Sequence, residues 1–168
     1  MQRLNLITKD VEEELFAGHP CEQLLRVGSL ADVRAAIDEH CSAVDAHCAR
    51  DASSEAAQPI SLDLIAHTTR DHRLLRVGTD VLDLLRPQVR AFFEELAAAR
   101  SFADRGIAQV RLLGCESAMR KTGLLTMQRL SRILGVPVYG STKSLMKSHF
   151  DAHGFNPAFE HILVQAAA

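Results

Sequence analysis

The sequence predicts an α/β fold with three layers, in which helices flank a mostly parallel sheet of about six strands. Three observations lead to this prediction. Apolar runs typical of buried strands recur along the chain, stretches with helical periodicity separate them, and 168 residues are enough for a real core. The chain has no low-complexity segment and no long linker, so we expect a single domain over residues 1–168.

The first elements lie between residues 2 and 44. Residues 2–7 alternate weakly between apolar and polar side chains, which predicts an edge strand, and residues 23–27 form a short apolar run. Ser29 and Asp32 then form the N-cap signature of a helix, whose apolar face repeats every three or four residues from Leu30 to Val44.

The middle of the chain begins with a loop. Residues 50–59 are small and polar and predict that loop, residues 60–67 predict a strand that ends in histidine, and residues 73–78 predict a short ribbon strand before a turn. Pro87 suits the first turn of a helix that runs to about residue 103.

The last third of the chain repeats the strand–helix pattern. Residues 107–114 predict a strongly apolar strand, and a helix that begins directly behind it ends at Gly135. Residues 136–140 predict another strand, and residues 161–165 predict the last one.

Composition excludes several classes of function. Apolar residues make up 47% of the chain and the formal net charge is −2, so we expect a globular protein that does not bind nucleic acid. No apolar run approaches the ~20 residues that cross a bilayer, and the N-terminus has no signal-peptide core, so we expect a cytoplasmic protein without a membrane span. The four cysteines, at 21, 41, 48 and 115, are too few and too irregular for a disulfide framework and indicate reduced thiols.

Two predicted strands end in reactive side chains. His67 ends the run LDLIAH, and Cys115 ends the run VRLLGC. If these strands are parallel neighbours, the two side chains emerge at the same edge of the sheet, where parallel α/β proteins place their chemistry. An imidazole beside a thiol supports the thiolate and later protonates a leaving amine. The start of a helix behind Cys115 would also favour the thiolate, and backbone N–H groups beside both residues could hold an oxyanion.

The pattern of a strand ending in histidine, about fifty residues, and a strand ending in cysteine resembles the caspase-like cysteine peptidases. The 48 residues from His67 to Cys115 agree with that spacing. LLGCESA, Gly123 and LSRILGVPVYGST resemble the CHAT-type and separase-like branch, and RLLRVGTDVLD is similar to the hairpin that follows the histidine there. The family usually has glycine directly after the histidine, where this chain has Thr68.

The resemblance implies a cysteine endopeptidase with no cofactor that cleaves a protein or peptide substrate. Cys115 would be the nucleophile, and His67 the general base and proton donor. The backbone N–H groups of Thr68 and Cys115 would stabilise the oxyanion, and Gly114, Glu116 and Ser117 would shape the site. Bacterial members of this branch often act in defence or regulated cell death, which is the pathway that the resemblance implies.

Other constellations predict less. His72 lies among charged residues and is expected in a solvated loop. His40-Cys41 and His47-Cys48 lie two helical turns (about 10.5 Å) apart, too far to share one zinc, with His19 and Cys21 upstream. His149 and His153 have no third ligand, so we predict no metal. No Gly-rich phosphate loop or serine elbow is present.

Two alternatives remain open at this point. The chain could be a caspase-like module that binds a partner without turnover, or a doubly wound α/β domain whose ligand lies at a strand switch point, with Cys115 incidental.

Overall fold

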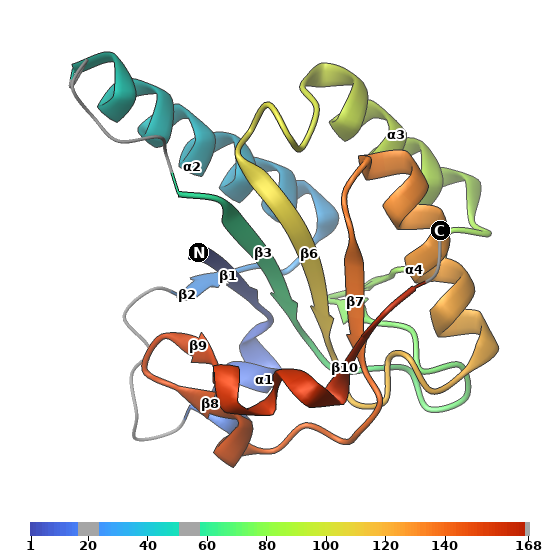
Figure 1. The fold of residues 1–168 in the computed structure, drawn as a ribbon. Helices are drawn as coiled ribbons and strands as arrows, with labels where there is room; N and C mark the ends of the chain where they lie inside the picture. The colour runs from blue at the N-terminus through green and yellow to red at the C-terminus, as the bar shows by residue number, and fades with distance from the viewer. Residues whose placement is uncertain (17–23, 51–57, 167–168) are drawn as a thin grey trace.

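The computed structural model describes residues 1–16, 24–50 and 58–166. Six strands form one mostly parallel sheet, in the order β2-β1-β3-β6-β7-β10 (Figure 1). Only β10 runs antiparallel to its neighbour, β7. The predicted α/β fold with about six mostly parallel strands is confirmed. The strands of this sheet are β1 (Gln2–Ile7), β2 (Leu24–Arg26), β3 (Ile60–Ile65), β6 (Ile107–Leu113), β7 (Val138–Ser141) and β10 (Leu163–Gln165).

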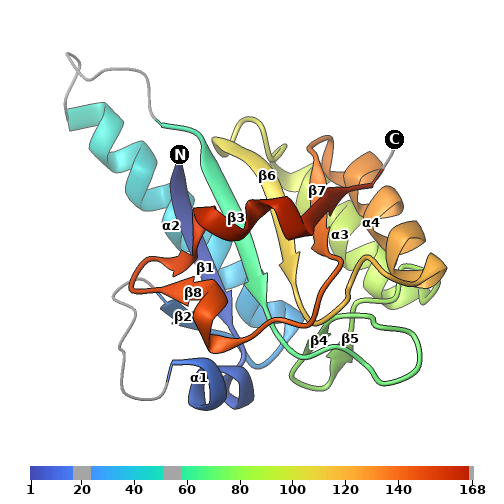
Figure 2. The ribbon, with the colours of Figure 1, turned by 60° about the horizontal axis from the view of Figure 1, so that its bottom comes forward.

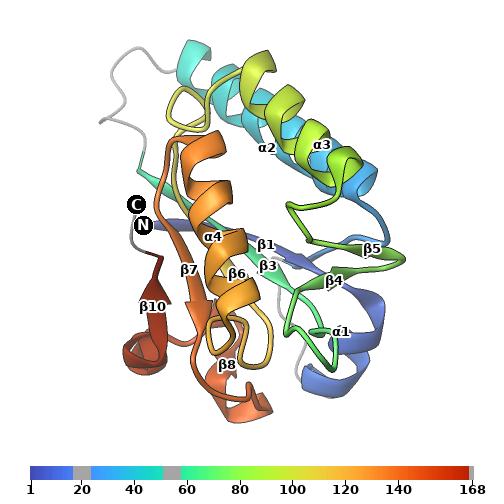
Figure 3. The same ribbon diagram turned by 90° about the vertical axis from the view of Figure 1, so that its right-hand side faces the viewer.

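Different elements cover the two faces of the sheet (Figure 3). One face carries α2 (Leu30–Arg50), α3 (Pro87–Ala99) and α4 (Lys121–Leu134). The C-terminal segment crosses the other face (Figure 2) with two 3-10 helices and a small hairpin: η1 (Lys147–His149), β8 (Phe150–Asp151), β9 (Gly154–Phe155) and η2 (Pro157–Ile162). The short helix α1 (Lys9–Leu15) lies at the carboxyl edge of the strands. No helix among the described residues has both the length and the apolar composition needed to cross a membrane.

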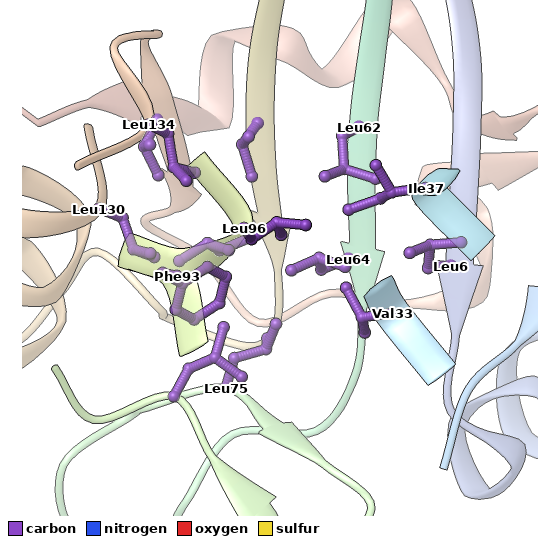
Figure 4. Packing of buried hydrophobic residues seen from close by; sticks show 14 of the residues in the cluster. Leu6, Val33, Ile37, Leu62, Leu64, Leu75, Phe93, Leu96, Leu130 and Leu134 are labelled. Carbon is purple, nitrogen blue, oxygen red and sulfur yellow. The ribbon is translucent and has the colours of Figure 1, made fainter. Parts of the chain in front are cut away.

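The main core lies between the sheet and its three helices (Figure 4). Leu6, Leu62 and Leu64 point from the strands toward the helices, where Ile37 and Leu96 meet them. A second, smaller core lies on the opposite face of the sheet and includes side chains from α1 and the C-terminal segment. The strands are therefore buried on both faces, which explains their nearly continuous apolar runs.

Two predictions about the order of elements were wrong. β1 lies inside the sheet between β2 and β3, and is not an edge strand. Its weak alternation arises because Asn5, on the second face of the sheet, is polar and yet fully buried. The helix α4 begins at Lys121, not directly behind Cys115, because residues 115–119 form turns instead.

The predicted ends of two helices are confirmed by their hydrogen bonds. Ser29 Oγ accepts from the backbone N–H of Asp32 at 3.2 Å, and the Asp32 carboxylate accepts from Gly28 N–H at 2.8 Å. These bonds satisfy N–H groups at the start of α2. Gly135 ends α4 with a φ of 70°, a left-handed conformation that suits glycine.

The predicted ribbon strand near residues 73–78 is one half of a hairpin. It is formed by β4 (Arg76–Val77) and β5 (Asp80–Val81), and α3 begins at Pro87 as expected. Most of the loop predicted at residues 50–59 lies outside the described residues.

A buried ion pair links β3 to β6. Asp63 and Arg111 are register partners on these parallel strands, and their side chains are 0% and 3% exposed. Arg111 donates from Nε to Asp63 Oδ1 at 2.7 Å, and its second nitrogen reaches Oδ2, so the pair is bidentate. Ser61 Oγ donates to Asp63 Oδ1 at 2.8 Å, and the Arg111 guanidinium lies 5.5 Å from the centre of the Phe155 ring. Hydrogen bonds and the contact with the Phe155 ring therefore fix the positions of both charged side chains.

We expect Arg111→Met to destabilise the fold by about 3–5 kcal/mol, because it leaves the Asp63 carboxylate buried and uncompensated. The measurement is the free energy of unfolding in urea. Arg90→Met is the matched control, because it breaks an exposed pair with Glu94 (2.7 Å) worth about 0.3–0.5 kcal/mol. Equal losses in the two variants would contradict a structural role for the buried pair.

Candidate active site

His67 and Cys115 emerge side by side from two neighbouring parallel strands. Ile65 on β3 pairs with Leu113 on β6, and the two candidate residues each lie two positions further on. Because side chains alternate along a strand, His67 and Cys115 project to the same face as Ile65 and Leu113. Both line one narrow cleft at the carboxyl edge of the sheet. The structure therefore brings the two residues together as the sequence predicts.

The cleft beside Cys115 is small. Val11 and Leu15 of α1 line one side, and Leu145, from the segment after β7, lines another. Its volume is about 20 Å³, enough for about one water molecule and too little for a side chain of a substrate.

The Cys115 thiol contacts the backbone of Leu145. Leu145 N–H donates to Cys115 Sγ at 3.3 Å, and Sγ in turn lies 3.8 Å from the Leu145 carbonyl oxygen. The partly exposed thiol of Cys115 is thus oriented by the chain on the far side of the cleft.

An acidic residue faces the candidate histidine. The Asp10 carboxylate, in the first turn of α1, lies 3.9 Å from His67 Nε2 and 3.4 Å from the Arg76 guanidinium. Partial burial raises the pKa of Asp10, but the nearby Thr8 hydroxyl, the charge of His67 and backbone N–H groups outweigh it and leave the pKa below its usual value. Asp10 is therefore ionised at neutral pH and presents a negative charge to the His67 ring.

Two backbone N–H groups have no hydrogen-bond partner within the described ranges: that of Cys115, which lines the cleft, and that of Thr68, which directly follows the cleft residue His67. Thr68 forms an antiparallel bridge with Leu75, whose hydrogen bonds run from Arg76 N–H to His67 O and from Thr69 N–H to Leu74 O. This pattern leaves the Thr68 N–H out of the ladder. These are the two groups that the sequence predicts for an oxyanion.

The Thr68 side chain also links the loop that follows β3 to the loop that follows β6. Its Oγ1 donates to the Cys115 carbonyl oxygen at 2.9 Å, a bond that a glycine at this position could not form. Gly114 permits this approach, because a Cβ there would lie 2.7 Å from Thr68 Cγ2 and 2.4 Å from Leu75 Cδ1.

Glu116 has a positive φ of 57°, and its ion-pair partner Arg73 has a φ of 54°. Arg73 Nε lies 3.2 Å from Glu116 Oε2, and Ser144 Oγ donates to Glu116 Oε1 at 3.1 Å. For a residue other than glycine, this left-handed backbone conformation carries a strain energy of about 1–3 kcal/mol, and such residues cluster at functional sites. Glu116 thus fixes the turn that follows Cys115, as a site-shaping residue would.

Ser117 lies behind the cleft and does not line it. It is buried, donates from Oγ to Leu112 O at 2.8 Å, and accepts from Ser141 N–H at 2.9 Å, so it ties the end of β6 to β7. The helix dipole predicted to act on Cys115 is absent from this position, because α4 begins at Lys121 and a dipole acts mainly within the first turn.

The remaining histidines and cysteines lie elsewhere or cannot be placed. His72 is exposed, and its carbonyl oxygen accepts from Thr122 Oγ1 at 2.9 Å. Cys41 is buried in the main core. His19 and Cys21, and the side chains of His47 and Cys48, lie outside what the structure describes. Among the described residues, no three potential metal ligands come together.

Sequence reasoning missed three residues of the site. Leu145 and Arg73 reach it only through tertiary contacts, so no local pattern marks them. Asp10 follows β1 closely, as His67 follows β3, and that similarity could have marked it.

Comparison with known proteins does not add a family to these observations. No protein-family model matches the chain, and the search of curated proteins gives no matching sequence. The function is therefore inferred from the residues and their geometry.

His149 holds the segment that carries Leu145. It is 8% exposed, its Nδ1 accepts from Met146 N–H at 3.0 Å, and its ring lies 4.6 Å from that of Phe159. Burial lowers the pKa of His149 below its usual 6.5, and the charge of His161 lowers it further. An acceptor Nδ1 requires the neutral ring.

We expect the fold to lose stability as the pH falls below about 6.5, because the unfolded chain then binds a proton on His149 that the folded chain excludes. The contribution of His149 is fully present above this pH and disappears as the pH passes through the lower pKa of the folded state. Urea unfolding from about pH 7 to about pH 5 measures it, with His149→Gln expected to show a flatter dependence. The exposed His153→Gln serves as control, and an unchanged slope in His149→Gln would contradict this assignment.

Proposed function

We propose that the protein is a caspase-like cysteine endopeptidase, of the CHAT-type and separase-like kind that its sequence resembles. One observation carries the proposal. His67 and Cys115 occupy matching positions on neighbouring parallel strands and line one cleft, beside two N–H groups that have no partner among the described residues. The order of strands, with one antiparallel strand at the edge of a parallel sheet, is compatible with this fold type.

In the first half of the reaction, His67 accepts the proton of the Cys115 thiol, and Sγ attacks the carbonyl carbon of the scissile peptide. Asp10 supports the imidazolium that forms. The carbonyl oxygen becomes an oxyanion, which the N–H groups of Thr68 and Cys115 stabilise. When the intermediate collapses, the C–N bond breaks, and His67 gives its proton to the leaving amine. An acyl-thioester on Cys115 remains.

In the second half, His67 accepts a proton from water, and the oxygen of that water attacks the thioester carbon. The C–S bond breaks, the acid product leaves, and the proton on His67 returns to the Cys115 sulfur. The protein thus returns to its starting state, and the net reaction is hydrolysis of one peptide bond.

A substrate needs more room than the cleft offers. With about 20 Å³ beside Cys115, a peptide can reach Sγ only if Leu145 moves away, which also breaks the N–H bond to sulfur. The segment after β7 is therefore proposed as the part of the wall that opens for the substrate.

A protein that binds a partner without turnover is the second candidate, and the same narrow cleft favours it.

We expect alkylation of Cys115 by iodoacetamide at mildly acidic pH to be rapid and to fall at least about tenfold in His67→Ala, because the thiolate depends on the imidazole. Peptide mapping by mass spectrometry measures the rate at Cys115 alone. His72→Ala is the matched control, a nearby exposed histidine outside the cleft.

Turnover of a peptide library should disappear in Cys115→Ala and fall about 10²–10⁴-fold in His67→Ala.

Three results can follow from these two assays. An alkylation rate of Cys115 that is the same in the wild type and in His67→Ala would contradict the proposed catalytic pair. Alkylation that depends on His67, without turnover of any peptide, would favour the binding module. Dependence on His67 in both assays would support the peptidase.

We expect Leu145→Ala to raise the alkylation rate of Cys115, because it removes a wall of the cleft while the backbone N–H stays in place. The variant should also lose about 2–5 kcal/mol of stability, since Leu145 is buried. Met146→Ala is the control, because Met146 lies in the same segment, is exposed and does not line the cleft. Equal rates in the two variants would show that Leu145 does not limit access.

A further inference from the structure

A second concave surface lies on the helical side of the molecule, lined by residues of α3, of α4 and of the segment just before α3. The two helices are neighbours there (Figure 3). We call this surface the arginine groove. It has a volume of about 500 Å³, which is much larger than the cleft beside Cys115. The residues that line it are Leu84, Leu85, Pro87, Arg90, Arg129, Arg132 and Ile133.

The charged residues that line the groove are all basic. Three guanidinium groups line it, from Arg90 on α3 and from Arg129 and Arg132 on α4, and no carboxylate lines it. The chain as a whole has a formal net charge of −2, so this local excess does not follow from its composition. The groove therefore offers a positive surface on a slightly acidic protein.

Among the described residues, only one of the three guanidinium groups has an ion-pair partner. The side chains of Arg129 and Arg132 form no hydrogen bond or ion pair there. Arg90 pairs with Glu94, but the two side chains are 63% and 46% exposed, and such pairs are weak. Arg132 lies in the last turn of α4, where it complements the helix dipole, but this explanation does not extend to Arg129 or Arg90.

The groove also has an apolar component. Leu84 is buried beneath it, Ile133 is partly buried and packs against the core, and Leu85 is 68% exposed beside it. A large aliphatic side chain with this exposure is ready to be covered by a partner. Apolar contacts with a rim of guanidinium groups fit a ligand that carries both aliphatic groups and carboxylates.

We propose that the arginine groove binds an acidic amphipathic helix of a partner protein. A helix laid between α3 and α4 would place its apolar face on Leu85 and Ile133, with glutamates or aspartates facing the arginines. Nucleic acid fits less well, because no aromatic side chain lines the groove for stacking. This proposal is independent of the peptidase chemistry at Cys115.

The test is fluorescence anisotropy with a panel of short labelled helical peptides, in which leucines on one face are flanked by glutamates. We expect binding that weakens with salt and falls at least about tenfold in the double variant Arg129→Glu/Arg132→Glu, since charge-assisted pairs are lost. Arg120→Glu/Lys121→Glu is the matched control, because it reverses two charges at the start of α4, outside the groove. Leu85→Ser, at an exposed site, should weaken binding without unfolding the protein.

The outcomes are distinct. Weak binding in the groove variants, with normal binding in the control and normal thermal unfolding in all of them, supports the proposal. Equal binding by peptides in which glutamine replaces glutamate would overturn it, and so would equal losses in the two double variants. Absence of binding by the whole panel, or binding to anionic lipid vesicles in its place, would also overturn it.

Discussion

The arrangement at the cleft depends on the register between β3 and β6, and one buried ion pair marks that register. Asp63 and Arg111 face each other on the two strands, and His67 and Cys115 each lie four residues further along. A slip of one residue would turn one candidate side chain to the opposite face of the sheet. It would also separate the fully buried Asp63 carboxylate from its guanidinium partner, which costs several kcal/mol. The pair therefore penalises the registers in which His67 and Cys115 do not meet.

Much of this fold could be predicted from the sequence, because the signals that encode it are local. Apolar runs predicted each strand of the sheet, and the hydrogen bonds of Ser29, Asp32 and Gly135 follow from their own backbone positions. The pairing of His67 with Cys115 could also be anticipated, because parallel strands end at one edge. The position of β1 and the start of α4 could not, since sheet order and the turns after Cys115 depend on tertiary contacts.

The second face of the sheet explains why the cleft is narrow. Its cover is the C-terminal segment, which has short 3-10 helices in place of long α-helices. Buried apolar side chains of the second core, among them Phe155 and Ile162, hold this segment against the sheet. Arg3 and Asn5 of β1 also donate to its backbone carbonyl oxygens. Under the proposed function, a substrate would have to displace Leu145 against these contacts, because the Leu145 backbone contacts the Cys115 thiol.

Backbone strain gives a reason to connect this cleft with chemistry. Arg73 and Glu116 both adopt left-handed conformations, and they pair with each other on the two loops that carry Thr68 and Cys115. The Thr68 hydroxyl bond to the Cys115 carbonyl fixes the same two loops a second time. A fold gains nothing in stability by holding two strained residues, each at a cost of about 1–3 kcal/mol. In the proposed function, the loops carry the two N–H groups that would stabilise an oxyanion, and preorganised donors need no rearrangement when charge develops. The strain is therefore compatible with a role for the loops beyond packing, and the Thr68 hydroxyl bond helps to hold them together.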